Sequence, residues 1–125
     1  MAKLLLIEDE PGIQDYFRTM VGRMGHEFVT ASDGPDGLEC LANDAGIDLV
    51  MTDLNMPGQP TGMDLVREIR TRKPDTPVVV VSGYPTQERL DECKRLGIKD
   101  FLTKPFEVTF FTSVVSRLLE EKGIS

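Results

Sequence analysis

Three short runs of consecutive apolar residues stand out in the chain, at positions 4–7, 49–51 and 78–81. Each is followed at once, or after one threonine, by polar residues: Glu8 and Asp9, then Asp53, then Ser82. Apolar runs of this length, separated by amphipathic stretches, favour parallel strands buried on both faces. Such sheets bind ligands at the carboxyl ends of their strands, so we expect these polar residues to meet at one edge.

The pattern predicts five strands alternating with five helices. We expect strands at residues 3–7, 27–31, 48–52, 77–81 and 99–102, and helices at about 11–24, 35–45, 63–72, 86–96 and 107–122. Glycines at positions 25 and 97 are expected to end the first and fourth helices. Repeated strand–helix connections force right-handed crossovers, so the chain is expected to form one doubly wound parallel α/β domain over residues 1–125. The irregular loop 54–62 follows the third strand, where loops tend to carry function.

Composition narrows the possible functions. The formal net charge of -7 argues against direct nucleic-acid binding, which needs basic patches to release counterions from phosphates. No apolar stretch is long enough to cross a membrane, and the N-terminus lacks the features of a signal peptide. Cys40 and Cys93 form no metal or redox motif. We therefore expect a cytoplasmic protein with reduced thiols and no membrane contact.

The acidic run Glu8-Asp9-Glu10 directly after a buried strand is the first candidate for chemistry. Crowded carboxylates at low dielectric are costly unless a cation neutralises them. With Asp53 they would form the incomplete oxygen cage that Mg²⁺ prefers when a phosphate completes its shell. The alternative is a solvated acidic turn that favours the N-terminus of the first helix.

Each of three further residues is weak evidence for a functional site when taken alone. Asp53 and Ser82 at strand ends are often turn or cap residues, and an isolated Lys104 is usually a solvated charge. Together with the acidic run they form a set: acids after strand one, Asp after strand three, a hydroxyl after strand four and Lys after strand five.

At these positions the sequence closely resembles the receiver domain of two-component response regulators. The segments that carry the resemblance are residues 7–10, 52–58, 81–84 and 101–106, and it covers essentially the whole chain. It implies a flavodoxin-like, five-stranded parallel sheet of order 2-1-3-4-5 with five helices.

The resemblance implies that Asp53 accepts a phosphoryl group from a phosphohistidine. Mg²⁺ would be held by Asp9 and Asp53, by Glu8 directly or through water, and by the backbone carbonyl of Asn55. Many receivers have Asp where this chain has Glu8. The loop at residues 58–62 looks one residue longer than the common form.

The other implied roles concern binding of the phosphoryl group and the switch. Ser82 and Lys104 would bind the phosphoryl oxygens. Phe101 would be the aromatic switch residue, where Tyr is frequent, and would move between inward and outward states with Ser82. Asn55 and Tyr84 would tune dephosphorylation by flanking the path of the attacking water.

The implied partners are a sensor histidine kinase or a histidine phosphotransfer protein. A downstream protein would bind the fourth helix, fifth strand and fifth helix, and a phosphorylation-dependent homodimer would be possible. Ile13 and Tyr16 either pack in the core or dock the kinase. We expect a receiver without an effector domain that transfers phosphate only to and from its own Asp53, and is otherwise no enzyme. A phosphorelay intermediate, a phosphate sink and a fragment of a larger regulator stay open.

Three other classes of protein fit these residues less well. A phosphatase of the haloacid-dehalogenase type also uses a strand-end Asp, but needs a second Asp where this chain has Asn55. A flavodoxin-like electron carrier needs a neutral phosphate loop, whereas Glu8-Asp9-Glu10 would repel the flavin phosphate. A receiver-like adaptor that is never phosphorylated would not need an intact acceptor, acid pair, hydroxyl and Lys.

Overall fold

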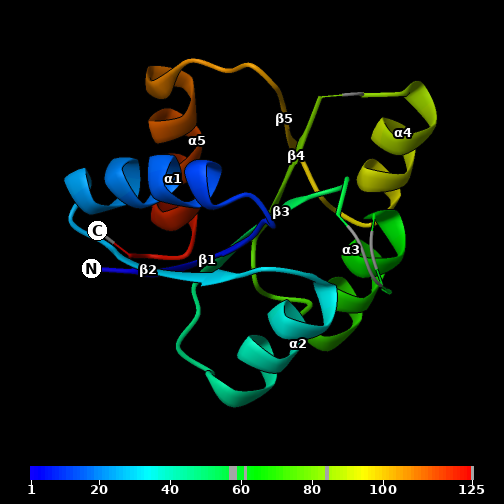
Figure 1. Cartoon of the computed structure of the whole chain (residues 1–125), viewed down its shortest axis with the longest axis horizontal. Helices are drawn as coiled ribbons and strands as arrows, with labels where there is room; N and C mark the ends of the chain where they lie inside the picture. Colours follow the sequence, from blue (N-terminus) through cyan, green and yellow to red (C-terminus); the bar gives the residue numbers. More distant parts are fainter. Residues whose placement is uncertain (57–58, 61, 84, 125) are drawn as a thin grey trace.

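Five parallel strands form one sheet in the order β2-β1-β3-β4-β5 in the computed structural model (Figure 1). The structure describes residues 1–56, 59–60, 62–83 and 85–124. The strands are β1 (Lys3–Ile7), β2 (Glu27–Ala31), β3 (Leu49–Asp53), β4 (Val78–Ser82) and β5 (Asp100–Thr103). The helices are α1 (Pro11–Arg23), α2 (Gly34–Asn43), α3 (Gly62–Arg72), α4 (Gln87–Arg95) and α5 (Val108–Glu121). The expected fold class, strand order and alternation of elements are confirmed.

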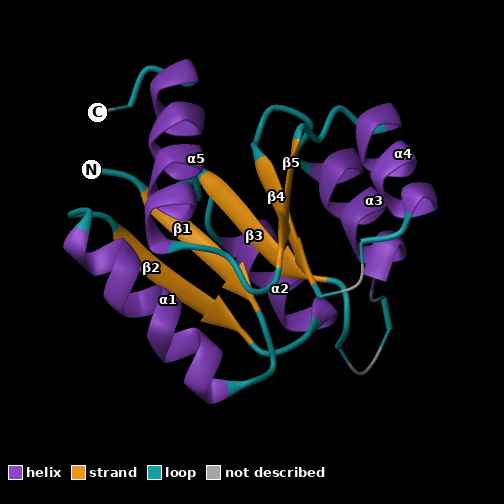
Figure 2. Ribbon diagram, turned by 90° about the horizontal axis from the view of Figure 1, so that it is seen from above, coloured by secondary structure: helices purple, strands orange, loops and turns teal. Residues whose placement is uncertain are grey.

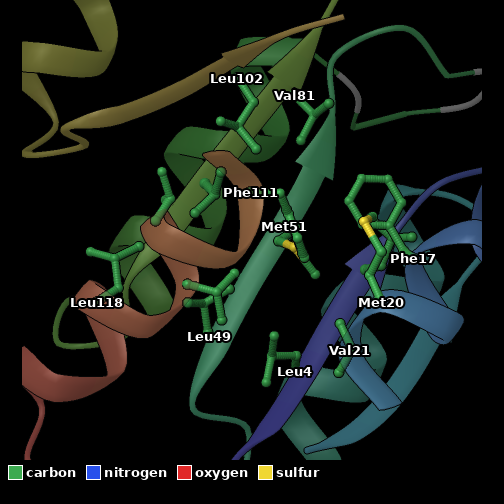
Figure 3. Packing of buried hydrophobic residues seen from close by; sticks show 14 of the residues in the cluster. Leu4, Phe17, Met20, Val21, Leu49, Met51, Val81, Leu102, Phe111 and Leu118 are labelled. Atoms are coloured by element: carbon green, nitrogen blue, oxygen red, sulfur yellow. The ribbon is translucent and has the colours of Figure 1, made fainter. Parts of the chain in front are cut away.

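The helices cover both faces of the sheet. Helices α1 and α5 lie on one face, and α2, α3 and α4 lie on the other (Figure 2). On the first face, Phe17 from α1 and Phe111 from α5 pack over Met51 of β3 (Figure 3). On the second face, Leu65 and Ile69 of α3 pack in the other core cluster. All five residues of β3 and of β4 are buried, as the uninterrupted apolar runs predict.

Three strands end one residue later than the sequence pattern predicts. The last residues of β3, β4 and β5 are Asp53, Ser82 and Thr103, and all three pair in register with a neighbouring strand. The prediction ended these strands at Thr52, Val81 and Leu102, each directly before the polar residue that ends the strand. A polar side chain does not prevent backbone pairing, so the ladder continues into the polar edge.

The helix ends follow the expected chemistry. Gly25 and Gly97, just beyond α1 and α4, have φ values of 83° and 78°, which residues with a Cβ rarely adopt. The side chain of Asp33 caps α2 by accepting from the Asp36 amide at 2.9 Å, and Thr86 caps α4 in the same way. Within the described residues, the helices are all too short or too polar to cross a lipid bilayer.

The loop that follows Asp53 rests on the start of α2. Gly34, the first residue of α2, lies so close to the backbone carbonyl of Pro60 that a Cβ there would overlap it. Backbone cannot move aside as a flexible side chain can. The glycine therefore permits the packing of this loop segment, whose residues 57, 58 and 61 lie outside the described part.

We expect Gly34→Ala to lower the free energy of unfolding by about 1–3 kcal/mol, the usual cost of overpacking. Gly22→Ala is the matched control, because Gly22 is an exposed helical position with open space around it. That change should instead raise stability by about 0.5–1 kcal/mol, since alanine loses less backbone entropy. Urea unfolding followed by circular dichroism measures both. Equal stability of Gly34→Ala and the wild type would contradict the proposed close packing.

Candidate functional site

The carboxyl ends of four strands bring the predicted site residues to one edge of the sheet. Asp53 is the last residue of β3 and pairs in register with Val81, so Ser82 follows at the next position of β4. The Lys104 amide, one residue beyond β5, donates to the Ser82 carbonyl at 2.9 Å. Glu8 lies one residue beyond β1, and its amide donates to the Ala31 carbonyl at 2.9 Å. The backbone ladder thus places these residues at neighbouring strand ends.

Asp53 is buried, and both of its carboxylate oxygens are hydrogen-bonded. Oδ1 accepts from the Asn55 amide at 2.9 Å, and Oδ2 accepts from Lys104 Nζ at 2.6 Å. These bonds fix the orientation of the carboxylate. They also give each oxygen a donor, as a buried anion requires.

Lys104 reaches a second carboxyl group, since its Nζ lies 3.4 Å from Glu8 Oε1. Burial alone would lower the pKa of Lys104. The hydrogen bond and charge of Asp53, with a further contribution from Glu8, outweigh that effect and hold its pKa above the ordinary value. Lys104 is therefore a fixed cation in the site, which excludes the solvated surface lysine considered from the sequence.

Glu8 is the least solvated of the acids in the turn after β1, with 2% of its surface exposed. Its desolvation, followed by a hydrogen bond with Asp53, raises the pKa of Glu8 to about 7, although the Glu10 amide opposes this. The ionised form of Glu8 is therefore disfavoured beside Asp53. Negative charge at this edge is only partly balanced by Lys104, and a further cation would stabilise it.

Asp9 is exposed, and its side chain adds to the rise in the pKa of Glu8. Across the described ranges, no cluster of three or more His, Cys, Asp or Glu side chains is arranged to hold a metal by itself. The available donors are hard oxygens: two buried carboxyl groups, one exposed carboxylate and the nearby Asn55 backbone. A donor set of this kind fits Mg²⁺, which keeps several waters and binds few protein ligands.

The remaining predicted residues lie around this group. Ser82 is fully buried at the end of β4, and Phe101 is half-buried in β5. Phe101 lines a surface groove of about 530 Å³ with Pro105 and Phe110. Asn55 is exposed beside the site, and Tyr84 lies outside the described residues.

Gln14 is a site residue that the sequence reasoning missed. Its side-chain Nε2 donates to the Glu8 backbone carbonyl at 2.6 Å, so α1 is tied to the acidic turn. The signal in the sequence was its place in the first turn of a helix that begins right after the acids. An amide there can reach back over the turn.

An apolar groove of about 250 Å³ adjoins Lys104. It is lined by Ile13, Tyr16 and Phe17 of α1 and by Pro105 and Phe106 after β5. The Phe17 and Phe106 rings pack with centroids 5.7 Å apart, while Tyr16 is 47% exposed. Ile13 therefore packs partly against the core, and Tyr16 leaves apolar surface open beside the site.

Comparison with known proteins finds response regulators among the relatives of this chain. Response regulator protein FleR of Pseudomonas aeruginosa is 38% identical over 116 residues, which are 93% of this chain and 24% of that protein. Transcriptional regulatory protein GlrR of Escherichia coli is 32% identical over 122 residues, 98% of this chain and 27% of that protein. The chain thus spans about a quarter of the length of these relatives.

The solved structures that resemble this chain are also response regulator proteins. A response regulator receiver domain protein from Clostridium thermocellum superposes with a TM-score of 0.90 at 28% identity, over 98% of both chains. The response regulator TrrA from Thermotoga maritima, solved with Mg²⁺ and BeF, has a TM-score of 0.83 at 26% identity, over 95% of this chain and 100% of that one. The family model described as the response regulator receiver domain matches residues 4–116. The chain therefore belongs to the receiver domains of two-component response regulators.

Proposed function

We propose that this receiver domain is a switch that is set by phosphorylation of Asp53. The observation that carries the proposal is the buried Asp53 carboxylate, held by Asn55 and Lys104 at the carboxyl edge of the sheet. A carboxylate oriented in this way can act as a nucleophile and form an acyl phosphate. Among the strand-end residues, Asp53 best combines a nucleophilic side chain with an adjacent cation.

In the transfer step, a carboxylate oxygen of Asp53 attacks the phosphorus of a phosphohistidine. The new O–P bond forms as the N–P bond breaks, and the electron pair goes to the imidazole nitrogen. Before the transfer, Lys104 Nζ lies 2.6 Å from Asp53 Oδ2. It can then pair with the phosphoryl oxygens as negative charge develops on them. Ser82, from the neighbouring strand end, would donate to the same oxygens. The domain then catalyses only the gain and loss of its own phosphoryl group.

Glu8, Asp9, Asp53 and the Asn55 carbonyl are the residues that we propose to hold Mg²⁺. The ion, when bound, supplies positive charge opposite the phosphoryl oxygens. Burial, together with the hydrogen bond and charge of Asp53, raises the pKa of Glu8, so a bound cation would favour its ionised form. The solved TrrA structure, which contains Mg²⁺ and BeF, supports this assignment by similarity.

The rival functions fit these residues less well. A second catalytic Asp would be needed at position 55 for haloacid-dehalogenase chemistry, but Asn55 stands there and contributes its backbone amide. A flavin phosphate would meet the carboxyl groups of Glu8 and Asp9 after β1. An adaptor that is never phosphorylated would have no use for a lysine aimed at a buried carboxylate.

Acetyl phosphate with Mg²⁺ should add one phosphoryl group to the wild type and none to Asp53→Asn, because the amide is a poor nucleophile. Asp75→Asn is the control, since Asp75 is exposed in the turn before β4, away from the carboxyl edge. Intact-mass measurement gives the result. Full phosphorylation of Asp53→Asn would show that the acceptor is another residue.

We propose that the phosphohistidine donor, a sensor kinase or a histidine phosphotransfer protein, docks on the apolar groove beside Lys104. The groove lies between the exposed ring of Tyr16 and the segment that carries Lys104. A protein bound there would hold its phosphohistidine near Asp53. The exposed aromatic area offers the binding energy for such a contact.

Tyr16→Ala should slow phosphorylation by a phosphohistidine protein roughly tenfold or more, as loss of an interface aromatic often does. Its rate with acetyl phosphate should stay unchanged, because the small donor needs no docking surface. Time courses with the two donors separate these effects. Equal rates of wild type and Tyr16→Ala with the protein donor would rule out docking through this ring.

We propose that the output face consists of α4, β5 and α5, and that a downstream protein or a second copy of the chain binds it after phosphorylation. Phe110 is 55% exposed and Val108 is 43% exposed at the start of α5, next to the groove that Phe101 lines. A charge-assisted bond from Ser82 to the phosphoryl group would draw the loop after β4 toward Asp53. That movement would open space in which the half-buried Phe101 could bury its ring.

Ser82→Ala should let Asp53 accept phosphate, though more slowly, while Phe101 no longer changes position. The reason is that the hydroxyl supplies the contact that differs between the two states. Aromatic NMR of Phe101 with and without beryllofluoride and Mg²⁺ measures the movement. The same spectral change in wild type and in Ser82→Ala would mean that another group transmits the signal.

A further inference from the structure

We propose that Gln14 is a positioning residue for the magnesium-binding acids, an inference that rests on the proposed function. It contacts neither Asp53 nor a phosphoryl group. Its side chain instead holds the backbone of the turn from which Glu8 and Asp9 project. The geometry that points to this role lies entirely within the described turn and the first part of α1.

Gln14 joins the turn to the helix by two bonds. Its backbone amide donates to the Glu10 carbonyl at 3.0 Å, which is the first hydrogen bond of α1. Its side-chain Nε2 donates to the Glu8 carbonyl at 2.6 Å. The rigid helix therefore holds the turn at both ends, with Asp9 between the two carbonyl groups.

Ile7 is the last residue of β1 in register with β2 and β3. The Glu8 amide still donates to the Ala31 carbonyl of β2, but the Glu8 carbonyl accepts from the Gln14 side chain. The side chain of Glu8 is also held, because its Oε2 accepts from the Glu10 amide at 3.2 Å. Gln14 fixes the main chain of Glu8, and the Glu10 amide then orients its carboxyl group.

A neutral amide suits this place. It donates a hydrogen bond but brings no full charge that would compete with Mg²⁺ for the carboxylates. The exposed side chain of Asp9 depends most on the backbone for its direction, because it lacks the dense packing around Glu8. Loss of the Gln14 bond should thus cost mainly the alignment of Asp9.

The test is Mg²⁺ binding to the unphosphorylated protein, followed through backbone amide shifts. Gln14→Met keeps chain length and helix propensity but removes the donor. It should weaken binding about threefold to tenfold, the range that one hydrogen bond supplies. Gln14→Leu removes the same donor and serves if the Met variant folds poorly, which the amide spectrum reveals.

Gln87→Met is the matched control. Gln87 also donates its amide to an acid, reaching Asp91 Oδ1 at 2.9 Å, but on the exposed surface of α4. The same chemical change there should leave Mg²⁺ affinity unaltered. A loss equal to that of Gln14→Met would show that any amide deletion has this effect and would overturn the proposal.

A double-mutant cycle separates positioning from general destabilisation. In an Asp9→Ala background, Gln14→Met should weaken Mg²⁺ binding no further, because the side chain that it aligns is gone. The role of Gln14 would be refuted, with the metal assignment left standing, by either of two results. One is wild-type Mg²⁺ affinity in Gln14→Met. The other is that Gln14→Met weakens Mg²⁺ binding as much in the Asp9→Ala background as in the wild type. If Asp9→Ala bound Mg²⁺ as well as the wild type, the metal assignment itself would fail, and the inference with it.

Discussion

The ion pair between Lys104 and Asp53 joins the segment after β5 to the centre of the sheet, at the edge where the buried strands end. Burial makes both charges expensive, so each needs the other. Glu8 shares the same ammonium at 3.4 Å and holds a proton more tightly than an exposed glutamate does. The constraint on the whole site is therefore that several carboxyl groups lie close together at low dielectric, with only one ammonium group to balance their charge.

The sequence predicted this contact across 51 positions because the strand order brings both residues to one edge. Uninterrupted apolar runs identified the buried strands, and the resemblance to receiver domains implied their order. The order of acids, Asp, hydroxyl and Lys after successive strands then placed the side chains near one another. Neither step required knowledge of side-chain packing.

Packing decided the features that the sequence did not predict. The acidic run gave no sign that Glu8 turns inward and Asp9 outward, because this depends on the turn between β1 and α1. The role of Gln14 was missed for the same reason: a glutamine in an amphipathic helix is usually solvated, and its reach to the Glu8 carbonyl is fixed by how the helix leaves the strand. The strand ends were misplaced by one residue because side-chain polarity does not report where backbone pairing stops.

Position 8 carries Glu, which has a longer side chain than the Asp that many receivers have there. This residue affects the balance between the two states of the proposed switch. Before phosphorylation, Lys104 is divided between Asp53 and Glu8. If a phosphoryl group draws Lys104 toward its own oxygens, Glu8 loses part of its counter-charge while remaining buried. It must then keep its proton or gain charge from a bound cation. The phosphorylated and unphosphorylated states would therefore differ in how strongly the acids of this turn demand Mg²⁺, and a difference of that kind is what allows an ion to favour one state over the other.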